Sequence, residues 1–443
     1  MDSKEVHVYH ADAGAGKTHQ LMDIISKHVK AGVPLHRIAL VTYTKAAAEV
    51  AKQRVCEQFG VNIKEAPHFR TIHSMCFQRV GAKVNEMMDN EKYRDFGKKA
   101  GYNFSAFVGS KDLDGVDWQH MKDDEIVSFE QLYRNHTKKA QWILDNKIDN
   151  IDFVRYCREY VKYKKTFGYK DFTDLLEMYV ANDFYEDVDV ACIDEAQDCT
   201  PLQWKVLFKA FRYAKYIYIV GDEKQSIYSF NGGEPRILLD MKGVQHTMDK
   251  SWRVPKNIND FVKKHIVSDM KEITPTELLS AHDGGEVKYI TTLDELPSIN
   301  LGKSYLFLTR NRKFFPEIEH WCRQHCIPYR LRNKPVFTNE DKMQFRDGLT
   351  STWEPNKLAM AQRYYARKTL FEQPVVHIDT IHGVKGDEAD IVVLFTDVSR
   401  LTWKELVENP ESEHRVFYVG CTRAKETLYI VSPETRYYYS YLF

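Results

Sequence analysis

The apolar and polar positions along the chain predict an α/β protein in which strands and helices alternate from the start. Residues 5–9 alternate polar and apolar side chains and predict a short strand, and QLMDIISKHV (residues 20–29) has the apolar spacing of a helix. Residues 188–193 are mostly apolar and predict a buried strand, as does KYIYIVGD at residues 215–222. Residues 303–331 indicate a strand, a helix and a second strand. Buried strands that alternate with helices are typical of parallel sheets.

Length, charge and composition narrow the class of protein. At 443 residues the chain is long enough for two or more domains, each with its own core. The formal net charge is zero, so a nucleic-acid partner would be held by local patches rather than by an overall basic field. Among the eight cysteines only Cys322 and Cys326 fall close together, which favours reduced thiols over a zinc site. No apolar run reaches the length of a membrane span, and we expect a soluble cytoplasmic protein with no membrane partner.

The stretch ADAGAGKTH (residues 11–19) matches a phosphate loop between the first strand and the first helix, with Ala11 where a glycine is usual. Backbone N–H groups of such a loop and the start of its helix face phosphate oxygens. Lys17 would reach the β and γ phosphates of ATP, and the Thr18 hydroxyl would hold Mg²⁺. The residues predicted to contact the nucleotide here are Ala13, Gly14, Ala15, Gly16, Lys17, Thr18 and His19. A glycine-rich turn without a ligand is the alternative.

Two carboxylates follow the predicted strand at residues 188–193. Parallel sheets bind their ligands at the carboxyl ends of the strands, and Asp194 and Glu195 stand at that end. We therefore predict that Asp194 binds the metal and that Glu195 orients or deprotonates the attacking water. A solvated acidic loop is the alternative, and the phosphate loop upstream argues against it.

Eight sequence blocks occur in an order that narrows the interpretation to one family. They are IALVTYTKAAAEV (38–50), TIHS (71–74), DFTDLL (171–176), IDEAQD (193–198), VGDEKQSIYSFNGGEP (220–235), SWRVP (251–255), DTIHGVKGDEAD (379–390) and FYVGCTRAKETL (417–428). This series resembles the motifs of UvrD/Rep-type superfamily 1 DNA helicases. The resemblance implies two RecA-like phosphate-loop motor domains with ATP bound at their interface.

The resemblance also assigns roles around the nucleotide. Gln225 matches the residue that senses the γ phosphate and links it to the DNA face, and Arg253 and Arg423 match two arginines that contact the γ phosphate. Trp252 stands where the family has a tyrosine that stacks on adenine. Glu388 matches a carboxylate that couples strand contact to the nucleotide site. For Trp252, a place in the core is the alternative.

Further positions match contacts to single-stranded DNA. Stacking on bases is implied for aromatic residues, because every base offers a π face whatever the sequence. Those residues are Tyr43, Tyr228 and Phe230. Hydroxyl and imidazole contacts are implied for Thr42, Thr44, Thr71, His73, Thr380 and His382. For each of these polar residues, helix capping or turn bonding is the alternative.

We expect the first motor domain at residues 1–76 and 166–250, interrupted by a largely helical insertion at 77–165. The second domain is expected at 251–335 and 372–443, with a reduced insertion at 336–371 where the family often carries a large one. The segment REYVKYKKTFGYK (158–170) interleaves basic and aromatic residues, which fits a DNA-facing patch or a solvated amphipathic helix.

These expectations lead to an ATP-dependent DNA helicase that moves 3′ to 5′ on single-stranded DNA and unwinds duplex in DNA repair, recombination or replication. Its expected partners are single strands, junctions with duplex and proteins of those processes, and a monomer is expected. The alternatives are a translocase that displaces bound proteins without efficient unwinding, and a helicase-like subunit recruited to a larger assembly. Residues 1–10 hold no glutamine of the kind that reads adenine in many relatives, so we also expect relaxed selectivity among nucleoside triphosphates.

Overall fold

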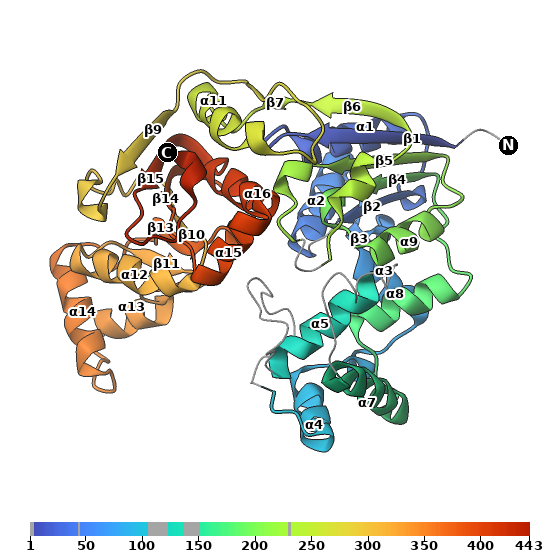
Figure 1. Ribbon diagram of the computed structural model, residues 1–443, viewed down its shortest axis with the longest axis horizontal. Helices are drawn as coiled ribbons and strands as arrows, with labels where there is room; N and C mark the ends of the chain where they lie inside the picture. Colours follow the sequence, from blue (N-terminus) through green and yellow to red (C-terminus); the bar gives the residue numbers. More distant parts are fainter. Residues whose placement is uncertain (1–3, 43–44, 105–122, 137–150, 229–231) are drawn as a thin grey trace. The chain divides into compact units, whose positions relative to one another are not determined.

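The computed structural model describes residues 4–42, 45–104, 123–136, 151–228 and 232–443 (Figure 1). The chain forms two compact units. The first comprises Met1–Ala11, Gly16–Met248 and Glu272–Thr276, and the second Asp12–Ala15, Asp249–Lys271 and Glu277–Phe443. Within the described ranges, no helix is both long and apolar enough to cross a membrane.

The first unit is built on a six-stranded sheet in which every neighbouring pair is parallel, in the order β3-β2-β4-β5-β1-β6. The strands are β1 (Glu5–Ala11), β2 (Ile38–Thr42), β3 (Phe69–Thr71), β4 (Val190–Ile193), β5 (Tyr216–Gly221) and β6 (Val244–Met248). The strands predicted from residues 5–9, 188–193 and 215–222 are therefore confirmed as β1, β4 and β5.

Helices cover both faces of this sheet, which explains the nearly continuous apolar runs of β2, β4 and β5. They are α1 (Lys17–Lys30), α2 (Lys45–Phe59), α3 (Ile72–Val80), α8 (Phe172–Ala181), α9 (Pro201–Ala210) and α10 (Pro235–Leu239). On β4, Ala191 and Ile193 point into the core shared with α3, α8 and α9, whereas Val190 and Cys192 point into the core shared with α1 and α2. Because successive side chains of β4 point to opposite faces of the sheet, this strand contributes to both hydrophobic cores.

The insertion of the first unit has an aromatic core of its own, formed by α4 (Asn90–Ala100), α5 (Asp123–Asn135) and α7 (Ile151–Phe167). Tyr160 and Tyr163 of α7 are buried in that core, so their rings are not available to bases and the DNA-facing interpretation of these two residues is wrong. Lys164 is also buried, with its Nζ 2.5 Å from Asp171 Oδ2 just before α8. The face of α7 that carries Lys164 therefore packs against protein rather than solvent.

A buried ion network joins the insertion to α8, one of the helices that cover the first sheet. Arg134 at the end of α5 donates hydrogen bonds to Glu130 at 3.3 Å and to Asp171 at 2.9 Å. Asp171 also caps α8, accepting a hydrogen bond from the backbone N–H of Asp174 at 2.7 Å. Burial raises the pKa of Glu130 to about 7. The guanidinium group of Arg134 therefore holds together several carboxylates that would be costly to bury alone.

The second unit contains a seven-stranded sheet in the order β12-β11-β13-β10-β14-β15-β9, parallel except between β11 and β12. The strands are β9 (Glu286–Ile290), β10 (Tyr305–Thr309), β11 (Tyr329–Leu331), β12 (Lys334–Pro335), β13 (Val376–Thr380), β14 (Ala389–Phe395) and β15 (Ala424–Val431), and a separate parallel pair is β7 (Lys250–Ser251) and β8 (Leu279–Ser280). The helices are α11 (Lys256–His265), α12 (Phe315–Gln324), α13 (Asn339–Arg346), α14 (Pro355–Ala366), α15 (Arg400–Glu408) and α16 (Pro410–Cys421). The strand, helix and strand predicted at residues 303–331 are confirmed as β10, α12 and β11.

Between β12 and β13 the chain forms α13 and α14, which pack on a small core. Phe337, Tyr364 and Leu370 are buried there together with Cys326. The Tyr364 hydroxyl donates to the backbone oxygen of Ile327 at 3.1 Å and so ties α14 to the segment before β11. This short segment is a folded element with its own apolar contacts.

Candidate nucleotide-binding site

The loop between β1 and α1 has the backbone of a phosphate-binding turn. Gly14 and Gly16 adopt left-handed conformations, with φ of 74° and 82°, which glycine tolerates without strain. Gly16 is the N-cap residue of α1, and the backbone N–H of Ala15 donates to the Asp12 oxygen at 3.1 Å. The loop therefore turns tightly into the positive end of a helix, where an anion is favoured.

Lys17 and two carboxylates meet at the carboxyl edge of the first sheet. Lys17 Nζ lies 3.6 Å from Glu195 Oε1, and the Glu195 N–H donates to Asp194 Oδ1 at 2.9 Å. Burial, together with the Glu195 charge, raises the pKa of Asp194 to about 7. Glu195 has a φ of 52°, which is rare for a residue with a side chain and is typical of functional sites.

This donor set fits a phosphate and a divalent cation. A buried carboxylate whose pKa is raised is stabilised by a nearby cation, and carboxylate and hydroxyl oxygens are the ligands that Mg²⁺ prefers. Thr18 follows Lys17 in the first turn of α1, directly after the loop. The chemistry of these residues is therefore that of a nucleotide site.

Gln197 connects the carboxylates to the loop after β5, and sequence reasoning did not identify it. Its amide nitrogen donates to Glu195 Oε2 at 2.6 Å, and its amide oxygen accepts from the Asp222 N–H at 2.9 Å. Its backbone oxygen accepts from the Ser226 hydroxyl at 3.1 Å. The sequence signal was the block IDEAQD (193–198), which contains Gln197 but to which no role for this residue was attached.

Gln225 lies in the same loop, in a short 3-10 helix, Glu223–Gln225. It is buried, and its amide nitrogen donates to Asp222 Oδ2 at 2.5 Å. Burial raises the pKa of Asp222. Through Asp222 and Gln197, Gln225 is two side chains away from Glu195.

His10, on β1 just before the phosphate loop, forms a second buried link to this loop. Its Nδ1 contacts Glu223 and lies 2.9 Å from the Thr274 hydroxyl, and its Nε2 lies 2.8 Å from Gln245 Oε1. Burial works against the protonated ring, but the hydrogen bond to Glu223 and its charge outweigh it, so the His10 pKa lies above its ordinary value. Strand β1 and the Glu223–Gln225 turn are therefore held together next to the phosphate loop.

The segment Asp12–Ala15 belongs by its contacts to the second unit. The Ser251 hydroxyl donates to the Ala13 oxygen at 2.6 Å, and the Trp252 N–H donates to the Gly14 oxygen at 2.9 Å. The Ala13 N–H donates to the Tyr418 hydroxyl at 3.1 Å. A Cβ at Gly14 would lie 2.7 Å from the Arg253 Cβ, so glycine is needed for this approach as well as for its conformation.

Arg253, Arg423 and Glu388 are brought together within the second unit. Arg253 lies 3.9 Å from Glu388, and the buried Arg423 donates to the backbone oxygens of Val419 at 3.0 Å and Asp387 at 3.2 Å. Glu388 directly precedes β14, and Arg423 directly precedes β15. The two predicted arginines therefore lie at the same edge of the second sheet.

The remaining predicted nucleotide residues lie at the surface. Trp252 is 62% exposed, with Lys250 Nζ 5.1 Å from its ring centre, so it is not a core residue. The side chain of His19 is 82% exposed, and its Nδ1 lies 3.3 Å from Asp23 Oδ2. An exposed indole ring is compatible with stacking on a base.

The described residues of the predicted DNA face follow the carboxyl ends of strands in both sheets. In the first unit, Thr71 caps α3 by accepting from the Ser74 N–H at 3.2 Å, and Thr42 is buried at the end of β2. Burial lowers the pKa of His73 to about 4, so its ring is neutral at pH 7. Burial also raises the pKa of Tyr228. Tyr43, Thr44 and Phe230 lie outside the described residues.

In the second unit, Thr380 ends β13 and His382 begins the 3-10 helix His382–Val384 that follows. The Thr380 hydroxyl accepts from the Gly383 N–H at 3.2 Å, which is the turn bonding that the sequence left open. Neither this bond nor the cap formed by Thr71 excludes a contact to DNA, because a hydroxyl oxygen has two lone pairs.

Comparisons with known proteins agree with this arrangement. The model of the UvrD/REP helicase N-terminal domain matches residues 3–245, and that of the UvrD-like helicase C-terminal domain matches residues 339–435. The chain belongs to the UvrD/REP helicase family. The predicted family and the predicted α/β fold with two RecA-like phosphate-loop motor domains are thereby confirmed.

Individual relatives share low sequence identity with this chain. The chain is 24% identical over 374 residues to the ATP-dependent DNA helicase Rep of Escherichia coli, which covers 75% of this chain and 54% of that protein. It is 26% identical over 256 residues to YjcD of Bacillus subtilis, over 52% of this chain and 32% of that protein. Among solved structures, arterivirus nonstructural protein 10 (helicase) matches 98% of this chain and 60% of that chain at 12% identity, with a TM-score of 0.39. The chain thus spans about a third to a half of the length of these two curated relatives.

Proposed function

We propose that this chain is the motor of an ATP-dependent DNA helicase that moves 3′ to 5′ along single-stranded DNA. The observation that carries the proposal is the hydrogen-bond path from Glu195 through Gln197 to the loop of Gln225. A carboxylate suited to water activation is joined by this path to the loop that continues toward Tyr228. Hydrolysis and strand contact would then be coupled by side chains that move together.

In the proposed reaction, Glu195 orients the attacking water and accepts its proton. Lys17, Arg253 and Arg423 stabilise the negative charge that develops on the transferred phosphoryl group. Thr18 and Asp194 would hold Mg²⁺, which would offset phosphate charge. Trp252 would stack on the base, and Gln225 would sense the γ phosphate.

DNA would contact residues at the carboxyl ends of strands in each sheet. Tyr228 would stack on a base, and Thr71, His73, Thr380 and His382 would contact the strand. Their places at or just after the ends of β3 and β13 and in α3 support this assignment. Such contacts do not depend on base sequence, as a motor requires. Single strands, junctions with duplex, and replication, repair or recombination proteins are the partners that we propose.

The test is steady-state ATP hydrolysis with and without oligo-dT. Wild-type protein should show strong stimulation by the strand, and Lys17→Ala and Glu195→Gln should each lose at least about 100-fold in kcat. Lys27→Ala, an exposed residue of the same helix, is the matched control and should behave as wild type. Hydrolysis that is absent, or indifferent to the strand, would contradict the proposal and favour a recruited, inactive subunit.

A translocase that strips bound proteins is the second candidate. It is favoured by the small size of the element at residues 336–371, where two short helices, α13 and α14, stand in place of a large insertion. Unwinding of a duplex with a 3′ tail, set against one with a 5′ tail, tests the direction. Displacement of a protein block without strand separation would identify the translocase.

A further inference from the structure

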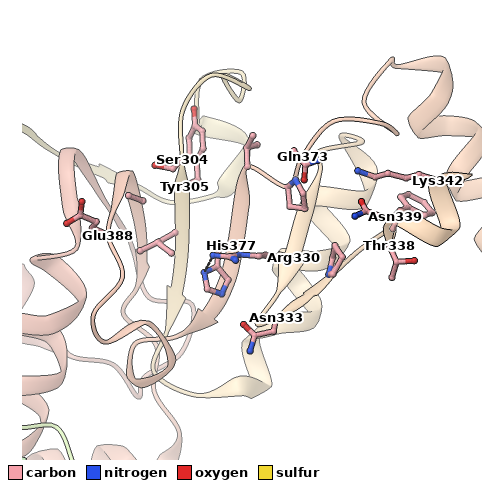
Figure 2. Close-up of a pocket in the computed structure, with 16 residues that line it drawn as sticks. Ser304, Tyr305, Arg330, Asn333, Thr338, Asn339, Lys342, Gln373, His377 and Glu388 are labelled. Atoms are coloured by element: carbon pink, nitrogen blue, oxygen red, sulfur yellow. Dashed lines mark hydrogen bonds between the residues drawn. The ribbon is translucent and has the colours of Figure 1, made fainter. Parts of the chain in front are cut away.

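A cavity of about 440 Å³ lies within the second unit, between its sheet and the short helical element (Figure 2). Arg330 on β11 and His377 on β13 line it from the sheet, and Asn339 and Lys342 line it from α13. Figure 2 shows Arg330 and His377 side by side, with Lys342 on the helix opposite. A volume of this size is typical of pockets for small ligands.

Arg330 and His377 contact each other in the wall of the cavity. The Arg330 guanidinium donates to His377 Nδ1 at 3.1 Å. Arginine has no acceptor, so His377 Nδ1 accepts this hydrogen bond. On the same ring, Asp379 lies 3.7 Å from Nε2 and Asp387 lies 3.9 Å from Nδ1. No carboxylate within the described ranges lies within 4.0 Å of the Arg330 guanidinium, so its charge is not neutralised by contact.

Lys342 provides a second positive charge of the same kind. Its Nζ donates to the backbone oxygen of Glu372 at 2.7 Å, and no carboxylate of the described part of the chain lies within 4.0 Å of it. Burial lowers the pKa of Lys342, and the charge of Glu372 opposes this shift. Glu388 lines the same cavity, but it lies 3.6 Å from Lys425 and 3.9 Å from Arg253, which offset its charge.

Three amides complete the lining: Asn333, Asn339 and Gln373. None of the three side chains forms a hydrogen bond to another residue that the structure describes. Each amide N–H₂ group offers two donors to a ligand oxygen. The cavity thus combines two cations that no carboxylate contacts with amide donors from both of its walls, and this combination favours a ligand with several anionic oxygens.

We propose that this cavity binds a phosphate group of a nucleotide or of a nucleic-acid strand, and that Arg330 and Lys342 contact its oxygens. No residue of the phosphate loop lines the cavity, whereas Glu388, which the sequence assigned to the coupling of strand contact and nucleotide site, does. It gives the short element at residues 336–371 a role in ligand binding, because α13 supplies one of the two cations.

The experiment measures acetylation of Lys342 by mass spectrometry in the protein of residues 1–443, with Lys334 on the neighbouring β12 as the internal control. Lys334 is exposed and does not line the cavity. Two titrations distinguish the sources of phosphate: one with oligo-dT and one with pyrophosphate. We expect one of them to slow acetylation of Lys342 by about fivefold or more without protecting Lys334, because a bound phosphate engages the amine.

Arg330→Gln should raise the ligand concentration for half-protection about 10-fold or more, because it removes a charged hydrogen bond. Lys334→Gln should leave that concentration unchanged. Protection by oligo-dT alone would identify a strand, and protection by pyrophosphate alone a free phosphate compound. Absence of protection by either, or protection that Arg330→Gln does not weaken, would overturn the proposal.

The same samples separate this proposal from the proposed function. Strand-stimulated ATP hydrolysis in a protein whose Lys342 is not protected would overturn the cavity site and support the proposed motor function. Protection of Lys342 in a protein that does not hydrolyse ATP would support the cavity site and overturn the proposed motor function.

Discussion

Replacing Asp194 with asparagine should stabilise the nucleotide-free protein above pH 7. Asp194 is buried beside Glu195, and its pKa is raised to about 7 from the ordinary 3.8. In the unfolded chain the carboxyl group loses its proton near pH 4, whereas in the folded protein it keeps the proton until about pH 7. Stability should therefore fall as the pH rises from about 4 to about 7 and level off above that.

The size of the effect follows from the same values. A difference of about three pH units, at about 1.4 kcal/mol each, gives an upper bound of about 4 kcal/mol. The attraction to Lys17 is already contained in that pKa, so about 2–4 kcal/mol, up to this bound, is expected at pH 8. In the Asp194→Asn variant the side-chain amide oxygen would still accept the hydrogen bond from the Glu195 N–H. For a domain of this size the gain corresponds to about 4–16 °C in Tm.

The assay is thermal melting from pH 5 to pH 9 without nucleotide or Mg²⁺. The Tm of the Asp194→Asn variant should not show the decrease between pH 5 and pH 7 that is expected of wild type. The ATPase activity of the variant should be lost. Glu195→Gln is the control: it removes the charge that helps to raise the Asp194 pKa, so the fall should move to lower pH. Parallel curves for wild type and Asp194→Asn, or a variant that is less stable at pH 8, would refute the reasoning.

Three further predictions concern contacts that only the structure revealed. Gln197→Ala removes the link between the carboxylates and the loop after β5. The variant should show about 10-fold or more weaker stimulation of ATP hydrolysis by oligo-dT. Unchanged stimulation would count against coupling through Gln197. Glu223→Gln removes the charge that raises the pKa of His10. The stability that comes from a raised histidine pKa is present at low pH and is lost as the pH rises, so the Tm of the variant should fall further below wild type at pH 6 than at pH 9. An equal decrease in Tm at both pH values would contradict this. Arg134→Met should lower the free energy of unfolding by about 3–5 kcal/mol, because it leaves buried carboxylates without their cation. Limited proteolysis should then cut the insertion first. A variant as resistant to the protease as wild type would show that the network adds no stability.

Local sequence features determined much of the fold. The phosphate loop, the strands β1, β4 and β5, and the carboxylates that follow β4 could all be predicted, because each depends on side-chain periodicity or on a short run of residues. The position of the carboxylates at the carboxyl edge also followed from sequence, since parallel strands share one polarity. The order of the motif blocks was enough to indicate the family.

Contacts between distant parts of the chain were decided only by the tertiary structure. Tyr160 and Tyr163 have the spacing of an amphipathic helix whether they face DNA or a core, and the other helices of the insertion decide the outcome by covering them. The bond from Ala13 to Tyr418 joins residues 405 positions apart, and no local pattern records such a partner. The cavity beside Arg330 likewise depends on how α13 packs against the sheet. Periodicity specifies which face of an element is buried, but the partner of each polar group depends on the folded neighbours that surround it.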